Sequence, residues 1–178
     1  MYRSLRMLVA VSSAALLAPL TLSAQDSAKK LDDATIAAIF DAANTYDIET
    51  SGLGAVKASD PAVRQMAANF VRDHKQVRQM GRDLLAKLHV TPTPPAGDKS
   101  AAATAAEMKK LRGLSGKAFD KAYLDYEIAF HQSVIDAVTT TLLPAIQNPE
   151  LKALVEKVAP AFQGHLAGAK HLREKMGA

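Results

Sequence analysis

The most informative hydrophobic pattern in the chain runs from Phe119 to Val138, where apolar residues recur with helical spacing. Projected at about 100° per residue, the apolar positions cover one half of a helix, and charged or amide side chains cover the other. Glu127 and His131 fall near the centre of the apolar half. Because they are four residues apart, they share one face, where a buried acid and imidazole need each other, a metal or another partner. The pattern therefore predicts a polar site inside the core.

The same periodicity predicts three further long helices, arranged with the first as two hairpins. A helix over about 32–59 is followed at once by Asp60 and Pro61, a cap and a proline at the first helical position. Asn148 and Pro149 repeat this device before the last helix of the chain. Such short turns require antiparallel packing of the helices that they join. We expect both turns at the same end of the bundle.

The connection between the two hairpins is longer. Residues 90–100 contain three prolines and a glycine and are predicted to form a loop, and a short helix is predicted over 104–114. The central helix should continue to about Gln147, with fraying or a kink at 139–141 and at Pro144. The fold class predicted is all-α, with almost no strand. Its architecture is a single antiparallel four-helix bundle over 32–176, with a short extra helix in the crossover.

The N-terminal segment, 1–24, has the pattern of a secretory signal peptide. Arg3 and Arg6 precede an apolar run that ends in small residues, so we expect cleavage after Ala24, with an uncleaved anchor as the alternative. Residues 25–31 are then a flexible leader. No later segment is apolar and long enough to cross a membrane, so the sequence indicates an exported, periplasmic protein.

Composition narrows the functional classes further. The chain has no cysteine, so it forms no disulfide and has no thiol nucleophile. Loss of the signal peptide removes two of 22 basic residues and none of 18 acidic ones, which leaves a charge of +2. Basic residues are interspersed with acids, and no basic run carries aromatics, which argues against nucleic-acid binding.

Histidines provide the candidate chemistry. His74 and His165 project to the middle of the apolar stripes of the second and last helices, and His131 does so on the central helix. Counted from the hairpin turns at about 1.5 Å per residue, the three lie at nearly one depth, about 20–26 Å. Glu49, at the flank of the first helix, and Glu127 are the candidate carboxylates. Such a set suits zinc, copper, iron or nickel, whereas a metal-free hydrogen-bond network is the alternative.

Four stretches resemble a bacterial family of exported proteins known as domain of unknown function 4142. They are YDIETSGLGAVKAS, DPAVRQMAANFVRDHKQV, LSGKAFDKAYLDYEIAFHQSVIDA and NPELKALVEKVAPAFQGHLAGAKHL, which together cover nearly all of residues 34–174. The resemblance implies a ferritin-like bundle and no established activity, and some family members are labelled outer membrane proteins. Val71 and Phe162 stand three residues before His74 and His165. The Glu-x-x-His pairs of di-iron proteins are therefore missing, and a site here would be mononuclear or poor in carboxylates.

These observations favour a non-enzymatic periplasmic binding or stress protein whose bundle holds a metal or a small ligand. A metal-dependent redox enzyme and a structural envelope protein that acts through protein contacts are the two alternatives. A filled coordination sphere would favour the first over the second. A large exposed apolar patch over a dry, metal-free core would favour the third.

Overall fold

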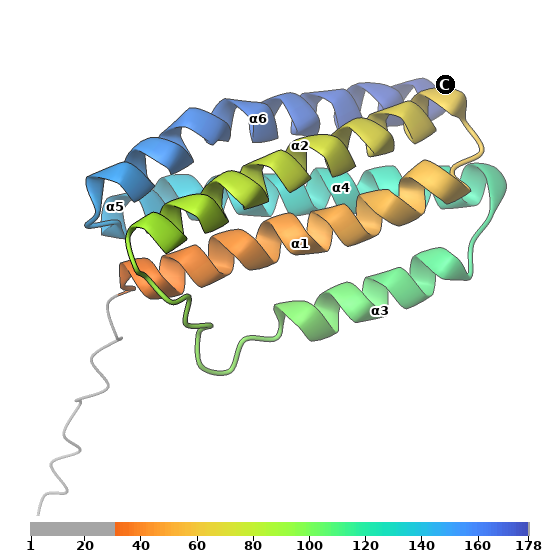
Figure 1. Cartoon of the computed structure of the whole chain (residues 1–178). Helices are drawn as coiled ribbons and strands as arrows, with labels where there is room; N and C mark the ends of the chain where they lie inside the picture. The colour runs from red at the N-terminus through yellow and green to blue at the C-terminus, as the bar shows by residue number, and fades with distance from the viewer. Residues whose placement is uncertain (1–30, 178) are drawn as a thin grey trace, which may run out of the picture.

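The computed structural model describes residues 31–177, which fold into helices and short connections without any strand (Figure 1). The predicted signal peptide and nearly all of the predicted leader lie outside this range. In the described part, no helix is long and apolar enough to span a membrane. The elements in chain order are α1 (Asp33–Lys57), α2 (Pro61–Lys87), α3 (Ser100–Arg112), α4 (Gly116–Ala137), the π-helical η1 (Val138–Leu142), α5 (Leu143–Ala145) and α6 (Pro149–Gly177).

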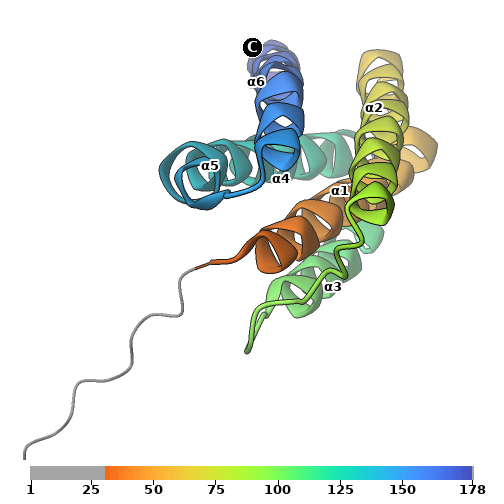
Figure 2. The ribbon, with the colours of Figure 1, turned by 60° about the vertical axis from the view of Figure 1, so that its left-hand side comes forward.

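The all-α four-helix bundle with an extra crossover helix is confirmed. α1 packs on α2 and α4 packs on α6 as two antiparallel hairpins, while α3 runs along the outside beside α1 (Figures 1 and 2). The predicted kink near residues 139–141 appears as the π-helical turn η1. The crossover helix begins at Ser100, four residues earlier than predicted, since the Asp98 carboxylate accepts a hydrogen bond from the Ser100 amide at 2.8 Å.

The prediction that both hairpin turns lie at one end of the bundle is wrong. Ala58, at the first turn, packs in one apolar cluster with Phe119 near the start of α4. Leu151, just after the second turn, packs in the other apolar cluster with Ile36 near the start of α1. The crossover spans the length of the bundle, so α4 begins beside the first turn and ends at the opposite end (Figure 1).

Each hairpin turn is held by an aspartate from the other hairpin. Asp120 of α4 accepts hydrogen bonds from the amides of Ser59 and Asp60 at 2.8 and 2.9 Å and from the Ser59 hydroxyl. Asp33 of α1 accepts hydrogen bonds from the amides of Gln147 and of the next residue, both at 2.8 Å. These carboxylates satisfy turn amides that lie outside the helices and join the two hairpins at both ends.

The core consists of two apolar clusters with a polar layer of α1, α2 and α4 residues between them. One cluster gathers around Phe40, Leu142 and Leu154, and the other around Phe70, Phe119 and Tyr123. The buried polar residues of the layer are Asn44, Asp47, Thr50, Ser51, His74, Glu127 and His131. Since buried polar groups are costly unless partnered, this layer is the part of the core that needs a specific explanation.

Candidate metal centre

The structure brings the three predicted histidines together near the middle of the bundle. His74 lies near the midpoint of α2, and His165 lies near the midpoint of α6. Counted from the first residue of each helix, their positions correspond to about 20–24 Å along helices that are about 40 Å long. Because each histidine is close to mid-helix, its depth is nearly the same from either end. The shared level therefore holds even though the turns lie at opposite ends.

α1 contributes an acid that the sequence analysis missed. Ala37, Phe40, Asn44, Asp47, Ser51 and Gly54 are all buried. They follow the alternating spacing of three and four residues that is typical of a packed helical seam. Asp47 is completely buried in this seam, and its Oδ2 faces two of the histidines. The spacing of three and four residues was the signal that could have found Asp47. A search for apolar positions misses this seam, because several of its residues are polar.

Glu49, predicted as a candidate ligand, does not join the cluster. Its side chain is exposed and lines a surface groove with Met108 and Arg112 of α3. A residue two positions after Asp47 is rotated by about 200° around the helix and so faces away from the core. The carboxylate beside the histidines is Asp47.

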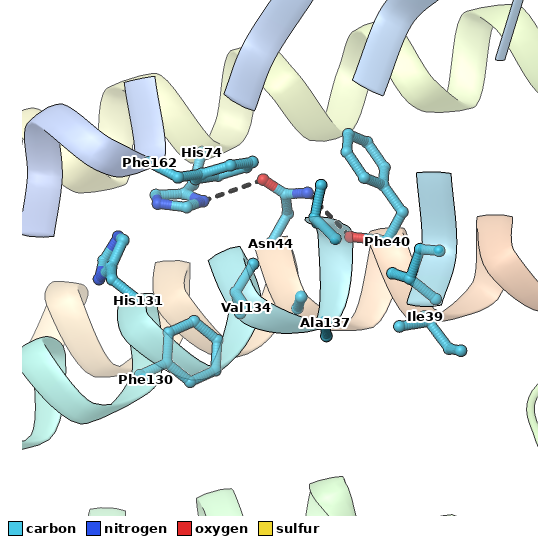
Figure 3. A pocket seen from close by; sticks show the side chains of 12 residues that line it. Ile39, Phe40, Asn44, His74, Phe130, His131, Val134, Ala137 and Phe162 are labelled. Carbon is cyan, nitrogen blue, oxygen red and sulfur yellow. Dashed lines mark hydrogen bonds between the residues drawn. The ribbon is translucent and has the colours of Figure 1, made fainter. Parts of the chain in front are cut away.

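His74 is oriented by an amide. Its Nδ1 lies 2.9 Å from Asn44 Oδ1, and Asn44 in turn donates from Nδ2 to the Phe40 carbonyl at 2.8 Å (Figure 3). The second contact fixes the orientation of the amide, so Oδ1 is the acceptor and Nδ1 of His74 carries the proton. The lone pair of a neutral His74 is therefore on Nε2, which lies 3.4 Å from Asp47 Oδ2.

His131 and His165 are oriented by oxygen atoms in the same way. His131 Nδ1 donates to the Glu127 carbonyl at 2.9 Å, which leaves Nε2 as the unprotonated nitrogen. His165 Nε2 donates to Asp73 Oδ2 at 3.2 Å, which leaves Nδ1 unprotonated. In all three neutral imidazoles, one nitrogen is held by an oxygen acceptor and the other is free, as in metal-ligating histidines.

His74, His131 and His165 each offer one ligand atom, and these atoms lie within 4.8 Å of one another. His165 Nδ1 lies 3.2 Å from His74 Nε2, and His131 Nε2 lies 3.5 Å from Asp47 Oδ2. An ion with tetrahedral ligands at about 2.0–2.1 Å separates its ligand atoms by about 3.3–3.4 Å. The two distances above and the 3.4 Å between His74 and Asp47 are close to this spacing. The two unprotonated nitrogens of His74 and His165 are close enough to repel each other unless a cation or proton lies between them.

Three buried atoms of the site have no hydrogen-bond partner among the described residues. They are Asp47 Oδ2, Glu127 Oε2 and His131 Nε2. The buried polar residues of this part of the chain include no lysine or arginine. A carboxylate without a cation in such surroundings is strongly disfavoured, so the layer lacks a positive charge that a bound metal ion would supply.

Burial sets the protonation states of these groups. It lowers the pKa of His74 to about 2 and that of His131 to about 4, and it raises the pKa of Asp47 to about 7. Burial lowers the pKa of His165 as well. Burial, followed by the charge of Asp47, raises the pKa of Glu127 well above its usual value. At neutral pH the imidazoles are therefore neutral, which is the form that binds metals.

Glu127 is the second carboxylate of the layer. Its Oε1 accepts hydrogen bonds from Thr50 and Ser51 at 3.3 Å each, and Ser51 also contacts the hydroxyl of Tyr123 at 2.9 Å. Ligand atoms of Glu127, Asp47 and His131 lie within 4.8 Å of one another. The predicted partnership of Glu127 and His131 thus extends to α1.

One edge of the centre reaches solvent. The side chains of His74, His131 and Asp47 are at most 2% exposed, whereas that of His165 is 11% exposed and that of Asp73 is 32% exposed. The ring of Phe70 stacks on His165 with centroids 4.1 Å apart. Between α2 and α6, the His165 and Asp73 pair therefore forms the outer edge of the centre.

Comparison with known proteins identifies a family and a fold. The sequence model of the family described as Domain of unknown function (DUF4142) matches residues 18–172. No curated protein matches the sequence significantly.

Three solved structures resemble the bundle. A DUF305 fragment from Deinococcus radiodurans has a TM-score of 0.70 at 16% identity and covers 80% of this chain and 95% of its own. A DUF305 protein from Streptomyces coelicolor, described as a putative secreted protein, has a TM-score of 0.66 at 18% identity. The match covers 81% of this chain and 93% of that protein. A protein named CopM, in its Cu(II)-bound form, has a TM-score of 0.62 at 16% identity. The match covers 82% of this chain and 98% of CopM. At these identities the likeness concerns the fold.

Proposed function

This chain belongs to the DUF4142 family, and we propose that it is a metal-binding protein that holds one divalent transition-metal ion in the core of its bundle. His74 Nε2, His131 Nε2, His165 Nδ1 and Asp47 Oδ2 are the proposed ligand atoms. Asn44, the Glu127 carbonyl and Asp73 hold the opposite nitrogens of the three imidazoles.

One observation carries this proposal. His74 and His131 present unprotonated Nε2 atoms to the orphaned Asp47 Oδ2 at 3.4 and 3.5 Å, and His165 Nδ1 lies 3.2 Å from His74 Nε2. A metal-free hydrogen-bond network is the competing account. In that network a protonated Asp47 or Glu127 carboxyl would donate to an imidazole nitrogen, because burial raises the pKa of both acids and opposes protonation of His74 and His131.

Zinc fits the spacing of the ligand atoms best. Three histidines and one carboxylate in a near-tetrahedral arrangement are typical of Zn²⁺, whereas Cu²⁺ prefers a flatter, tetragonal arrangement. Copper nevertheless binds most nitrogen and oxygen sites more tightly than zinc does. The fold of CopM, solved with Cu(II), supports copper as the second candidate. Calcium and magnesium would require more oxygen ligands.

The ligand set favours binding over catalysis. Four protein ligands complete a tetrahedral sphere, as in structural zinc sites, whereas catalytic sites keep one position open. We assign Glu127 as the outer carboxylate of the centre, because its Oε2 is orphaned beside Asp47 and His131. The redox-enzyme alternative would require that Asp47 leave the ion or that a fifth ligand enter.

We place this metal-binding protein outside the cytoplasm, with a mature chain that begins near Gln25. The support is the charged and apolar pattern of segment 1–24 and the lack of a membrane-spanning helix in the described part. Cell fractionation with mass determination of the N-terminus tests this. An intact chain with Met1 in the inner membrane would refute it.

Equilibrium metal binding tests the main proposal. Untagged protein is stripped with a chelator and titrated with Zn²⁺ and Cu²⁺ at pH 7.5, beside His131→Ala and His171→Ala. His171 is an exposed histidine of α6 and is the matched control. We expect one ion per chain for the wild type and for His171→Ala, and a loss of at least 100-fold in affinity for His131→Ala. Equal affinity of the two variants, or no stoichiometric binding by the wild type, would contradict the proposal.

A further inference from the structure

A cavity lies beside the imidazoles, in the half of the bundle that contains α5. Its volume is about 50 Å³, and α1, α2, α4, η1 and α6 all contribute to its wall (Figure 3). His74, His131 and Phe162 form the buried side of the wall. Ile39 and Val134 lie on the other side and are half-buried. The cavity thus extends from the seam between α1 and α4 to the histidines.

The wall offers almost no free polar group. Asn44 is its only amide, and both ends of that amide are already bonded, to the Phe40 carbonyl and to His74 Nδ1. His74 and His131 each use Nδ1 on an oxygen acceptor, and their free Nε2 atoms do not face the cavity, because its lining surface is entirely apolar. The remaining lining residues are apolar. A buried water needs two to four polar partners, so this cavity favours an apolar occupant over water.

The backbone at this point departs from the regular α-helix. Val138 and Leu142, the first and last residues of the π-helical turn η1, both line the cavity. π-helical residues make up well under 1% of residues in globular proteins and are frequent at functional sites. The cavity therefore coincides with the one π-helical turn of residues 31–177.

We infer that this cavity is a binding site for a small, neutral, apolar molecule of the size of dioxygen. An engineered apolar cavity of about 150 Å³ accepts benzene or xenon. A cavity of about one third of that volume is large enough for a single heavy atom or a diatomic molecule and too small for benzene. The cavity lies beside the proposed metal centre and shares the rings of His74 and His131 with it.

Xenon is the probe for this site, with methyl NMR of the metal-free protein as the readout. Raising the xenon pressure should shift the methyl signals of Ile39, Val134 and Leu142 in a saturable way, while benzene should leave them unchanged. Because the protein is metal-free, the result does not depend on the metal proposal. The absence of a saturable shift in the wild type would overturn the inference.

A filling variant locates the site. Ala43, another residue of the wall, is half-buried on α1, and Ala43→Leu should abolish the xenon-induced shifts. Ala129→Leu, an exposed position on α4, is the control and should keep them. If Ala43→Leu does not fold, Val134→Ile takes its place as the filling variant. It adds a single carbon to the wall and should weaken xenon binding. Xenon-induced shifts of wild-type size in both filling variants would also overturn the inference.

Discussion

Replacement of Asp47 by asparagine should stabilise the metal-free protein while removing the metal site. In the folded chain, burial raises the pKa of Asp47 from 3.8 to about 7. Above pH 7 the carboxylate is ionised in both states, and this rise corresponds to a destabilisation of about 4 kcal/mol. Asparagine has nearly the same shape and no charge, but its buried amide lacks full hydrogen bonding, which costs about 1–3 kcal/mol. We therefore expect Asp47→Asn to gain about 1–3 kcal/mol in the free energy of unfolding at pH 8.

The pH dependence of the free energy of unfolding separates the effect of the Asp47 charge from the cost of burying the asparagine amide. A carboxyl with a raised folded-state pKa destabilises the fold fully above that pKa and not at all below its unfolded value. At pH 5, only the unfolded chain is largely ionised at this position, so the destabilisation falls to about 2 kcal/mol. The advantage of Asp47→Asn over the wild type should thus shrink by about 2–3 kcal/mol between pH 8 and pH 5.

Urea unfolding with a chelator present provides the assay, repeated with excess Zn²⁺. Zinc should raise the urea midpoint of the wild type strongly, because a ligand of the folded state adds RT ln(1 + [L]/Kd) to its stability. The midpoint of Asp47→Asn should rise much less. The reasoning would be refuted if Asp47→Asn were less stable than the wild type at pH 8 without metal, or if zinc stabilised both proteins equally.

Other predictions concern the frame that holds the centre. A Cβ at Gly54 would lie 2.7 Å from the Tyr123 ring, so Gly54→Ala should cost about 1–3 kcal/mol of stability. Gly52→Ala meets nothing within 4 Å and should gain about 0.5–1 kcal/mol. Asp120→Asn weakens charge-assisted bonds to the first turn, including those from Ser59, and should cost about 2–3 kcal/mol. Urea unfolding of the metal-free variants measures all three; equal effects of the two glycine changes would show that the α1–α4 contact is misplaced.

The fold was predictable because the sequence marks its helices repeatedly. Apolar stripes define the long helices, and the cap-plus-proline pairs at Asp60 and Asn148 locate both turns. The direction of the second hairpin was not predictable, because the loop pattern of residues 90–100 does not say how far the crossover extends. The crossover runs the whole length of the bundle because α3 packs beside α1 and Asp120 contacts the first turn.

The centre was predictable in part. His74, His131, His165 and Glu127 stand out as polar residues on apolar stripes. Asp47 does not, because its neighbours in the α1 seam, Asn44 and Ser51, are also polar, so apolar residues do not mark the seam at this level. Both neighbours hydrogen-bond to residues of the site. Asn44 accepts a hydrogen bond from His74, and Ser51 donates one to Asp47 at 3.0 Å.

X-ray absorption at the zinc edge tests the central claim most directly. For protein loaded with one equivalent of Zn²⁺, we predict four nitrogen or oxygen ligands at about 2.0–2.1 Å, with the multiple-scattering signature of three imidazoles. In His165→Ala the spectrum should fit two imidazoles. A six-coordinate sphere of oxygen ligands, or a wild-type spectrum with one imidazole or none, would contradict the account of His74, His131, His165 and Asp47 as the metal centre.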